Sequence, residues 1–213
     1  MGLIEGAAII IILLFSVILH EISHGWAAFS LGDPTAKYAG RLTLNPIKHL
    51  DPFGSILLPG ILILMAKLSG GHGIIFGWAK PVPVNPYNFK DKKYGEAKVA
   101  IAGPLANIIL AVAFGLLIRF GGLTLGIVPL FLLQYIVWIN LVLAIFNLLP
   151  IPPLDGSHIL FTFLPYSAKS VKLFLAQYGM FIIIFFIFFF SPIIFSIVNF
   201  LFVLITGTPF LLS

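Results

Sequence analysis

Two histidines and a glutamate near the N-terminus have the types and spacing of a metal site. They form the pattern H-E-x-x-H within His20-Glu21-Ile22-Ser23-His24. Residues four positions apart lie on one face of a helix, so both imidazoles can bind a single zinc ion. Glu21 lies beside them, where its carboxylate can accept a proton from a water molecule that zinc activates. The pattern therefore predicts a hydrolytic zinc centre.

A catalytic zinc ion normally has three protein ligands and one open position, and the third ligand is not local here. An extended form of the pattern would need glycine and histidine where this chain has Ala27 and Ser30. Glu5 is about four helical turns from His20, which is too far to reach. Four other acids lie in polar connectors, where solvated charge is the usual interpretation: Asp33, Asp51, Asp91 and Glu96.

Asp155 is the strongest candidate for the third ligand. It follows a proline-rich break, NLLPIPPLDG, that starts at Asn147 and interrupts two apolar stretches. Non-helical backbone at membrane depth is tolerated only where it is buried in protein or lines a cavity. An acid on such a break is well placed to bind a metal, and a helix cap near the membrane interface is the alternative interpretation.

The composition is that of an integral membrane protein. Of 213 residues, 60% are hydrophobic and 9% are charged, whereas soluble domains have about 25% charged residues. This excludes a soluble enzyme, a disordered regulator and a coiled coil, and we expect residues 1–213 to form a single membrane domain. The net charge is +5. The few basic residues lie between the apolar segments, so they indicate how the chain is oriented in the membrane and do not indicate nucleic-acid binding. The absence of cysteine excludes disulfides and cysteine ligands.

Several apolar stretches approach the roughly 20 residues needed to cross a bilayer. We expect an all-α polytopic protein with five full transmembrane helices, and short β-type loops at Arg41–Leu44 and Lys80–Val84. The short piece Phe53–Ala66 is broken by Pro59-Gly60 and is predicted to be re-entrant, or else a sixth apolar segment. The five predicted spans are Ile4–Leu31, Ala97–Phe120, Leu123–Leu149, Val171–Phe190 and Ile193–Leu212.

The basic residues predict the orientation. If Phe53–Ala66 does not cross, eleven of the twelve lie on one side and Arg119 alone on the other. The positive-inside rule favours this arrangement, with the N-terminus outside and the C-terminus in the cytoplasm. The two polar connectors, Gly32–Pro52 and Gly70–Lys93, are then cytoplasmic as well. The predicted zinc ligands support the same arrangement. His20 and Asp155 can reach one ion only if the chain crosses the membrane an even number of times between them, and two crossings satisfy this.

Four passages resemble the site-2 protease family of intramembrane zinc metalloproteases. They are HEISHGWAA from His20, LTLNPIKHLDPFGSILLP from Leu42, AGPLANI from Ala102 and FNLLPIPPLDGSHIL from Phe146. The resemblance implies that His20, His24 and Asp155 hold one zinc ion and that Glu21 activates water. It also implies a compact form without the PDZ or CBS modules of many relatives.

Two asparagines are candidate substrate or oxyanion residues, Asn147 and Asn107. The resemblance relates Asn147 to a residue that holds the substrate backbone or the oxyanion, and an amide donor near zinc could stabilise an oxyanion. Asn107, in the AGPLANI passage, is left open between packing and support of the site. Asn140 is interpreted as an interhelical hydrogen-bonding residue.

The resemblance implies a zinc metalloendopeptidase that cleaves peptide bonds in or near transmembrane segments of membrane protein substrates. The expected partners are those segments and the lipid bilayer, with no nucleic acid. The expected location is the plasma membrane of a prokaryote, with the active site toward the cytoplasm. Two alternatives stay open: a metal transporter using His20, His24 and Asp155 transiently, and an inactive scaffold that binds helices in the same groove.

Overall fold

The computed structural model describes residues 3–57, 61–62, 64–65, 79–124 and 126–210. Four of its helices are long and apolar enough to cross a membrane, which confirms an all-helical membrane fold. In lipid such a chain must satisfy its backbone hydrogen bonds internally, and helices do so. The elements in chain order are α1 Leu3–Ser30, α2 Thr35–Tyr38, η1 Pro46–Lys48, η2 Pro52–Leu57, η3 Pro86–Asn88, α4 Gly95–Gly121, η4 Gly122–Thr124, α5 Ile127–Asn147, α6 Asp155–Phe163, η5 Tyr166–Ala168 and α7 Lys169–Thr206.

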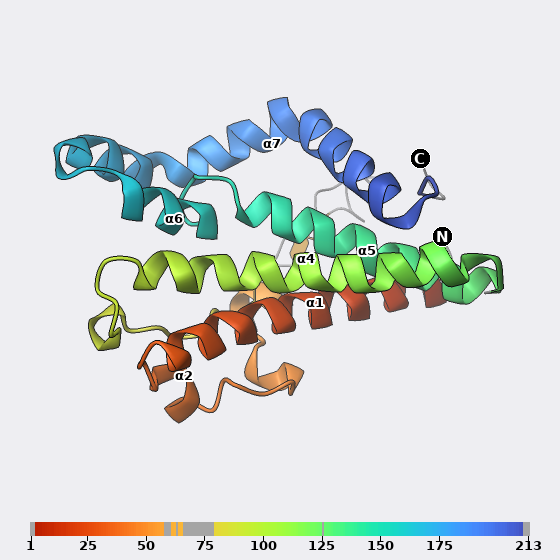
Figure 1. Ribbon diagram of the computed structural model, residues 1–213, viewed down its shortest axis with the longest axis horizontal. Helices are drawn as coiled ribbons and strands as arrows, with labels where there is room; N and C mark the ends of the chain where they lie inside the picture. The colour runs from red at the N-terminus through yellow and green to blue at the C-terminus, as the bar shows by residue number, and fades with distance from the viewer. Residues whose placement is uncertain (1–2, 58–60, 63, 66–78, 125, 211–213) are drawn as a thin grey trace.

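Helix α4 lies at the centre of the bundle, where it contacts α1, α5, α6 and α7. Figure 1 shows α1, α4 and α5 running side by side, with the connector that contains α2 on the outer side of α1. The main hydrophobic core joins α4 and α5 to the second half of α7, through buried side chains such as Ala111, Val137 and Phe202. Helices α1, α4 and α5 thus pack against one another and fix the relative positions of the side chains between them.

The predicted break at Ser191-Pro192 is wrong, because one helix, α7, runs through it. Proline removes a single helical hydrogen bond and can bend a helix without ending it, and Figure 1 shows α7 bent along its length. Its 38 residues span about 57 Å, which exceeds the roughly 30 Å of a hydrocarbon core. The described residues therefore hold four candidate spans where five were expected.

The two ends of the described chain lie at one end of the bundle, which corrects the expectation of opposite sides. Figure 1 places the N- and C-terminal ends together. Arg119, at the end of α4, donates a hydrogen bond to the Leu204 carbonyl in the last turn of α7, at 2.7 Å. The end of α1 with α2, the start of α4, and the turn from α6 into α7 lie at the opposite end (Figure 1).

The connectors differ from the expected β-type loops. Within the described residues, Arg41–Leu44 and Lys80–Val84 form no strand, and the first connector contains the one-turn helix α2. Isolated contacts replace a strand ladder here, such as the Lys80 N–H donating to the His49 carbonyl at 2.9 Å. Of Phe53–Ala66, residues 53–57 belong to the π-helical turn η2, while 58–60, 63 and 66 lie outside the described residues.

Candidate metal centre

His20 and His24 lie on one face of α1, as their spacing predicts. Their Nε2 atoms are 3.0 Å apart and their rings are edge to face. Both residues are buried within the bundle, at 6% and 8% exposure. They lie within about 15 Å of the helix end at Ser30, so the pair is inside the bundle but close to the end that carries the connectors.

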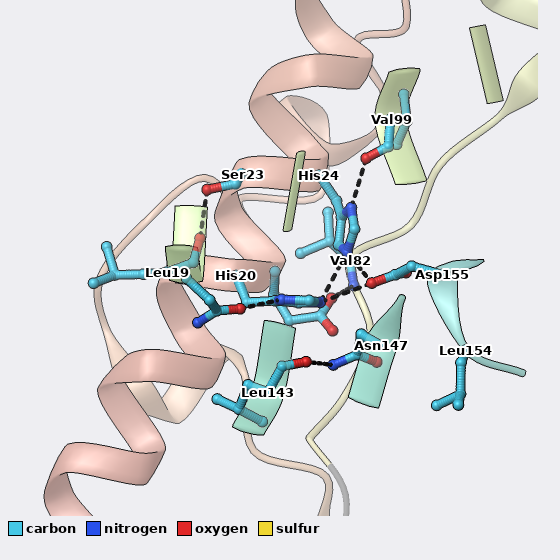
Figure 2. Close-up of polar contacts among 12 residues, drawn as sticks. Leu19, His20, Ser23, His24, Val82, Val99, Leu143, Asn147, Leu154 and Asp155 are labelled. Atoms are coloured by element: carbon cyan, nitrogen blue, oxygen red, sulfur yellow. Dashed lines mark hydrogen bonds and ion pairs between the residues drawn. The ribbon is translucent and has the colours of Figure 1, made fainter. Parts of the chain in front are cut away.

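Asp155 begins α6, directly after the proline-rich turn that follows α5. Its Oδ2 atom lies 3.1 Å from Nε2 of His20 and 3.3 Å from Nε2 of His24. Gly156 allows this approach, since a Cβ there would lie 2.2 Å from the Leu148 carbonyl oxygen. Figure 2 shows both imidazoles directed at the Asp155 carboxylate. Asp155 belongs to a segment more than 130 residues further along the chain.

The other ring nitrogen of each histidine is engaged by an oxygen. Nδ1 of His24 lies 2.8 Å from the backbone oxygen of Val99, and Nδ1 of His20 lies 2.6 Å from Oδ1 of Asn107. Both partners come from α4. A carbonyl oxygen can only accept, so each histidine donates from Nδ1 and presents the lone pair of Nε2 to Asp155.

Behind His20, a buried chain of hydrogen bonds joins three helices. The Asn107 side-chain amide donates to Oδ1 of Asn140 at 2.7 Å, and it lies 3.4 Å from the Ser16 backbone oxygen. The Asn140 amide donates to Oγ of Ser16 at 2.9 Å and to the Ile136 backbone oxygen at 2.8 Å. Asn140 is therefore an interhelical hydrogen-bonding residue, as interpreted from the sequence.

The geometry of the three converging atoms fits zinc. Two nitrogen lone pairs and a carboxylate oxygen face one another, which is repulsive unless a cation lies between them. Their separations of 3.0–3.3 Å match the roughly 3.3 Å between ligands on a tetrahedral zinc with bonds of about 2.0–2.1 Å. Oδ2 of Asp155 is also buried and accepts no hydrogen bond.

Glu21 lies beside this cluster at a cavity of about 470 Å³. Its Oε2 atom accepts a hydrogen bond from the Val82 backbone N–H at 2.8 Å, which holds the carboxylate at the cavity wall. His20, His24 and Asp155 line the same cavity. A cavity with room for water thus meets three candidate ligands and one carboxylate base.

The two candidate asparagines, Asn147 and Asn107, occupy different positions. Asn147 lines the cavity, and its amide donates to the Leu143 carbonyl of its own helix at 3.0 Å (Figure 2). Asn107 is fully buried behind His20 and is not among the described residues that line the cavity. Its amide and carbonyl are both engaged inside the bundle, which suits support of the site and not contact with an oxyanion.

The family model for peptidase family M50 matches residues 8–126 and 122–190. The chain belongs to peptidase family M50. YwhC of Bacillus subtilis, named provisionally as a zinc metalloprotease, is 42% identical over 87% of this chain and 81% of its own length. Rip2 of Mycolicibacterium smegmatis, named in the same way, is 29% identical over 67% of this chain and 52% of its own length. No solved structure matches the chain.

This M50 peptidase is a zinc metalloprotease of the intramembrane, site-2 type. The family assignment favours proteolysis over the metal-transporter and scaffold alternatives. The structure brings His20, Glu21, His24 and Asp155 together at one cavity.

Three contributors to the site were not predicted. All three act through contacts between segments that are far apart in the sequence. They are the Val82 N–H that holds Glu21, the Ser16 side chain behind Asn140, and Gly103. A Cβ on Gly103 would lie 2.5 Å from Nε2 of His24 and 2.6 Å from Cε1 of His20. The glycine of the AGPLANI passage was the available signal, since glycine often marks close approach of backbone to another group.

Asp33, just after the end of α1, binds the segment before α4 that lines the cavity. Its carboxylate accepts hydrogen bonds from the Asn85 N–H at 2.7 Å, from the Asn88 side chain at 2.8 Å, and from Thr35. Burial by itself raises the pKa of Asp33, but these donors outweigh it and hold the pKa below its ordinary value. The segment that carries Val82 is thereby tied to the end of α1.

Proposed function

We propose that residues 1–213 act as one intramembrane protease domain that hydrolyses peptide bonds in or near membrane-spanning segments of other membrane proteins. The observation that carries the proposal is the convergence of Nε2 of His20, Nε2 of His24 and Oδ2 of Asp155 beside the Glu21 carboxylate. This cluster lies inside a bundle of helices that are long and apolar enough to span a bilayer.

His20, His24 and Asp155 are the proposed zinc ligands. When bound, zinc supplies a lowered pKa for water and polarises the carbonyl of the scissile bond. Three protein ligands leave a fourth position open, as catalytic zinc centres require. The Nδ1 hydrogen bonds to Asn107 and Val99 keep both imidazoles oriented with Nε2 toward the ion.

Glu21 is the proposed general base. The Val82 N–H binds one carboxylate oxygen and leaves the other to take a proton from the attacking water and pass it to the leaving amine. Substrate helices have to unwind locally, because a helical amide is hydrogen-bonded and shielded. Substrates with helix-destabilising glycine, proline or asparagine near the scissile bond are therefore favoured. Asn147, at the same cavity, is the proposed contact for the unwound substrate backbone.

The proposed orientation places the connectors in the cytoplasm and the site toward that side of a prokaryotic plasma membrane. All described lysines and arginines except Arg119 belong to the connectors or to the first turns of α4 and α7, which is the one-sided distribution that the positive-inside rule describes. With α7 crossing once, the described part of the chain has four spans and returns to the side of its N-terminus.

The test is Glu21→Gln. This variant keeps the zinc ligands, so purified protein should retain one zinc per chain while cleavage of a transmembrane reporter falls by at least about 100-fold. Asp155→Ala should lose both zinc and cleavage. Glu5→Gln makes the same change at the far end of α1 and serves as the matched control. Undiminished cleavage by Glu21→Gln would show that the proposed mechanism is wrong.

A further inference from the structure

A second cavity, of about 480 Å³, lies on the other side of the segment that holds Glu21. It is bounded by the connector after α2 and by residues 80–83, and Pro81 borders both this cavity and the zinc cavity. Three of its lining side chains are basic, namely Arg41, Lys48 and Lys80, and no carboxylate lines it. Every acidic residue of the chain lies in the described part, so masked residues supply no carboxylate to it.

Arg41 is an unusual residue in this cavity because it is buried and incompletely paired. It is only 5% exposed. Its Nη2 donates to the backbone oxygens of Lys80 at 2.5 Å and of Pro81 at 3.3 Å, while its buried Nε has no hydrogen-bond partner. Asp51, whose sequence neighbours Leu50 and Pro52 line the cavity, accepts the backbone N–H groups of Phe53 and Gly54. A buried guanidinium with an unused donor is costly unless an anion binds to it.

The rim of this cavity is apolar, and in the proposed orientation the cavity lies near the cytoplasmic end of α1. Ile47 lines the cavity and is 74% exposed, and Leu44 and Phe53 nearby in sequence are 56% and 54% exposed. The connector packs on the outer side of α1, close to the helix end (Figure 1). A cationic interior with an apolar rim at this depth suits an amphiphile whose headgroup is anionic.

We propose that this cavity binds the phosphate of an anionic lipid headgroup, with Arg41, Lys48 and Lys80 around the phosphate oxygens. Arginine matches phosphate geometry through several N–H donors, and lysine adds charge. The same guanidinium holds the carbonyls of Lys80 and Pro81, directly before the Val82 N–H that positions Glu21. A bound headgroup thereby steadies the segment on which the Glu21 carboxylate rests.

The experiment is a binding titration on the full chain. Delipidated protein is reconstituted in phosphatidylcholine nanodiscs, and native mass spectrometry follows the uptake of added phosphatidylglycerol. The variant Lys48→Gln/Lys80→Gln removes two exposed charges of the cavity, so folding is not at issue. Lys90→Gln/Lys93→Gln makes the same charge change just before α4, at residues that do not line the cavity, and is the matched control. Inorganic phosphate is titrated separately to distinguish a lipid from a soluble anion.

We expect the wild type and the Lys90/Lys93 control to bind one phosphatidylglycerol tightly, and Lys48→Gln/Lys80→Gln to bind it about tenfold more weakly. If the wild type binds inorganic phosphate but not phosphatidylglycerol, and the cavity variant binds neither, the ligand is a soluble phosphate and the lipid assignment is overturned. Equal weakening in both double variants would show surface charge only and would overturn the proposal. So would a wild type that neither prefers phosphatidylglycerol nor binds phosphate.

Discussion

Nδ1 of His20 lies 2.6 Å from the side-chain oxygen of Asn107, and this contact decides which nitrogen of His20 faces the metal site. The assignment of that oxygen follows from the hydrogen bonds behind it. The Ile136 backbone carbonyl can only accept, so the group of Asn140 that faces it is the amide NH₂. Oδ1 of Asn140 therefore faces Asn107, whose own NH₂ must turn toward it.

The remaining oxygen of Asn107 is then directed at His20, which donates from Nδ1 and keeps the lone pair on Nε2. One backbone carbonyl in α5 thus fixes, through two amides, the tautomer of a zinc ligand in α1. Outer contacts of this kind typically change metal affinity by about 10–100-fold when removed. Asn107 and Asn140 are positioning residues on this argument, because neither touches the reacting atoms.

Asn107→Leu should weaken zinc binding by about 10–100-fold, because the His20 ring loses its orienting acceptor. Asn140→Leu should have a smaller effect of the same sign, since Asn107 is then free to turn over. Chelator competition measures the zinc affinity, and the visible spectrum of the cobalt-substituted protein reports the ligand geometry. Asn199→Leu, the same change on α7, is the control. Unchanged affinity and an unchanged cobalt spectrum in Asn107→Leu would contradict the relay.

Gly103→Ala should disrupt the zinc site without altering any polar group. The added Cβ would lie 2.5–2.6 Å from atoms of both imidazoles, and the backbone of a central helix cannot retreat. We expect a large loss of bound zinc in purified protein. Gly6→Ala, on α1, meets nothing within 4 Å and should bind zinc normally. Full zinc content in Gly103→Ala would mean that the helices separate more easily than the packing indicates.

The candidate ligands could be predicted from the sequence because each carries a signal in its own neighbourhood. H-E-x-x-H fixes two imidazoles on one helix face, and the proline break before Asp155 marks non-helical backbone within an apolar region. The partners of Nδ1 could not be predicted in this way. They depend on how α4 is rotated against α1, and contacts between positions 20 and 107 leave no spacing pattern.

The fold prediction failed at Pro192, because proline is compatible both with the start of a helix and with a bend inside one. The sequence around Pro192 suits the first turn of a new helix, but it equally suits the interior of a bent one. Packing of Ile194, Val198 and Phe202 against α4 and α5 selects the second. The first three spans were predicted to within a few residues, because their apolar runs end at polar or turn-forming segments.

Asp33→Asn should destabilise the protein more at neutral pH than at acidic pH. The pKa of Asp33 is lower in the folded state than in the unfolded state. Its stabilising contribution is therefore complete above the unfolded-state pKa of about 4 and is lost as the pH falls through the folded-state pKa. At pH 7 the loss of hydrogen bonds to a charged acceptor should cost roughly 1.5–3 kcal/mol. Thermal unfolding of both proteins in detergent, at neutral pH and near about pH 3, measures the difference. A difference in Tm that does not shrink with acid would contradict this role.

Single-cysteine labelling should show that α7 crosses the membrane once. The chain has no cysteine, so each introduced thiol is the only one present. Tyr87→Cys lies at the connector end, whereas Phe120→Cys and Thr208→Cys lie at the ends of α4 and α7 that meet through Arg119. An impermeant maleimide added to intact cells should label Phe120→Cys and Thr208→Cys but not Tyr87→Cys, and all three should react after permeabilisation. Because five spans would put Thr208 with Tyr87, protection of Thr208→Cys in intact cells would restore the five-span arrangement.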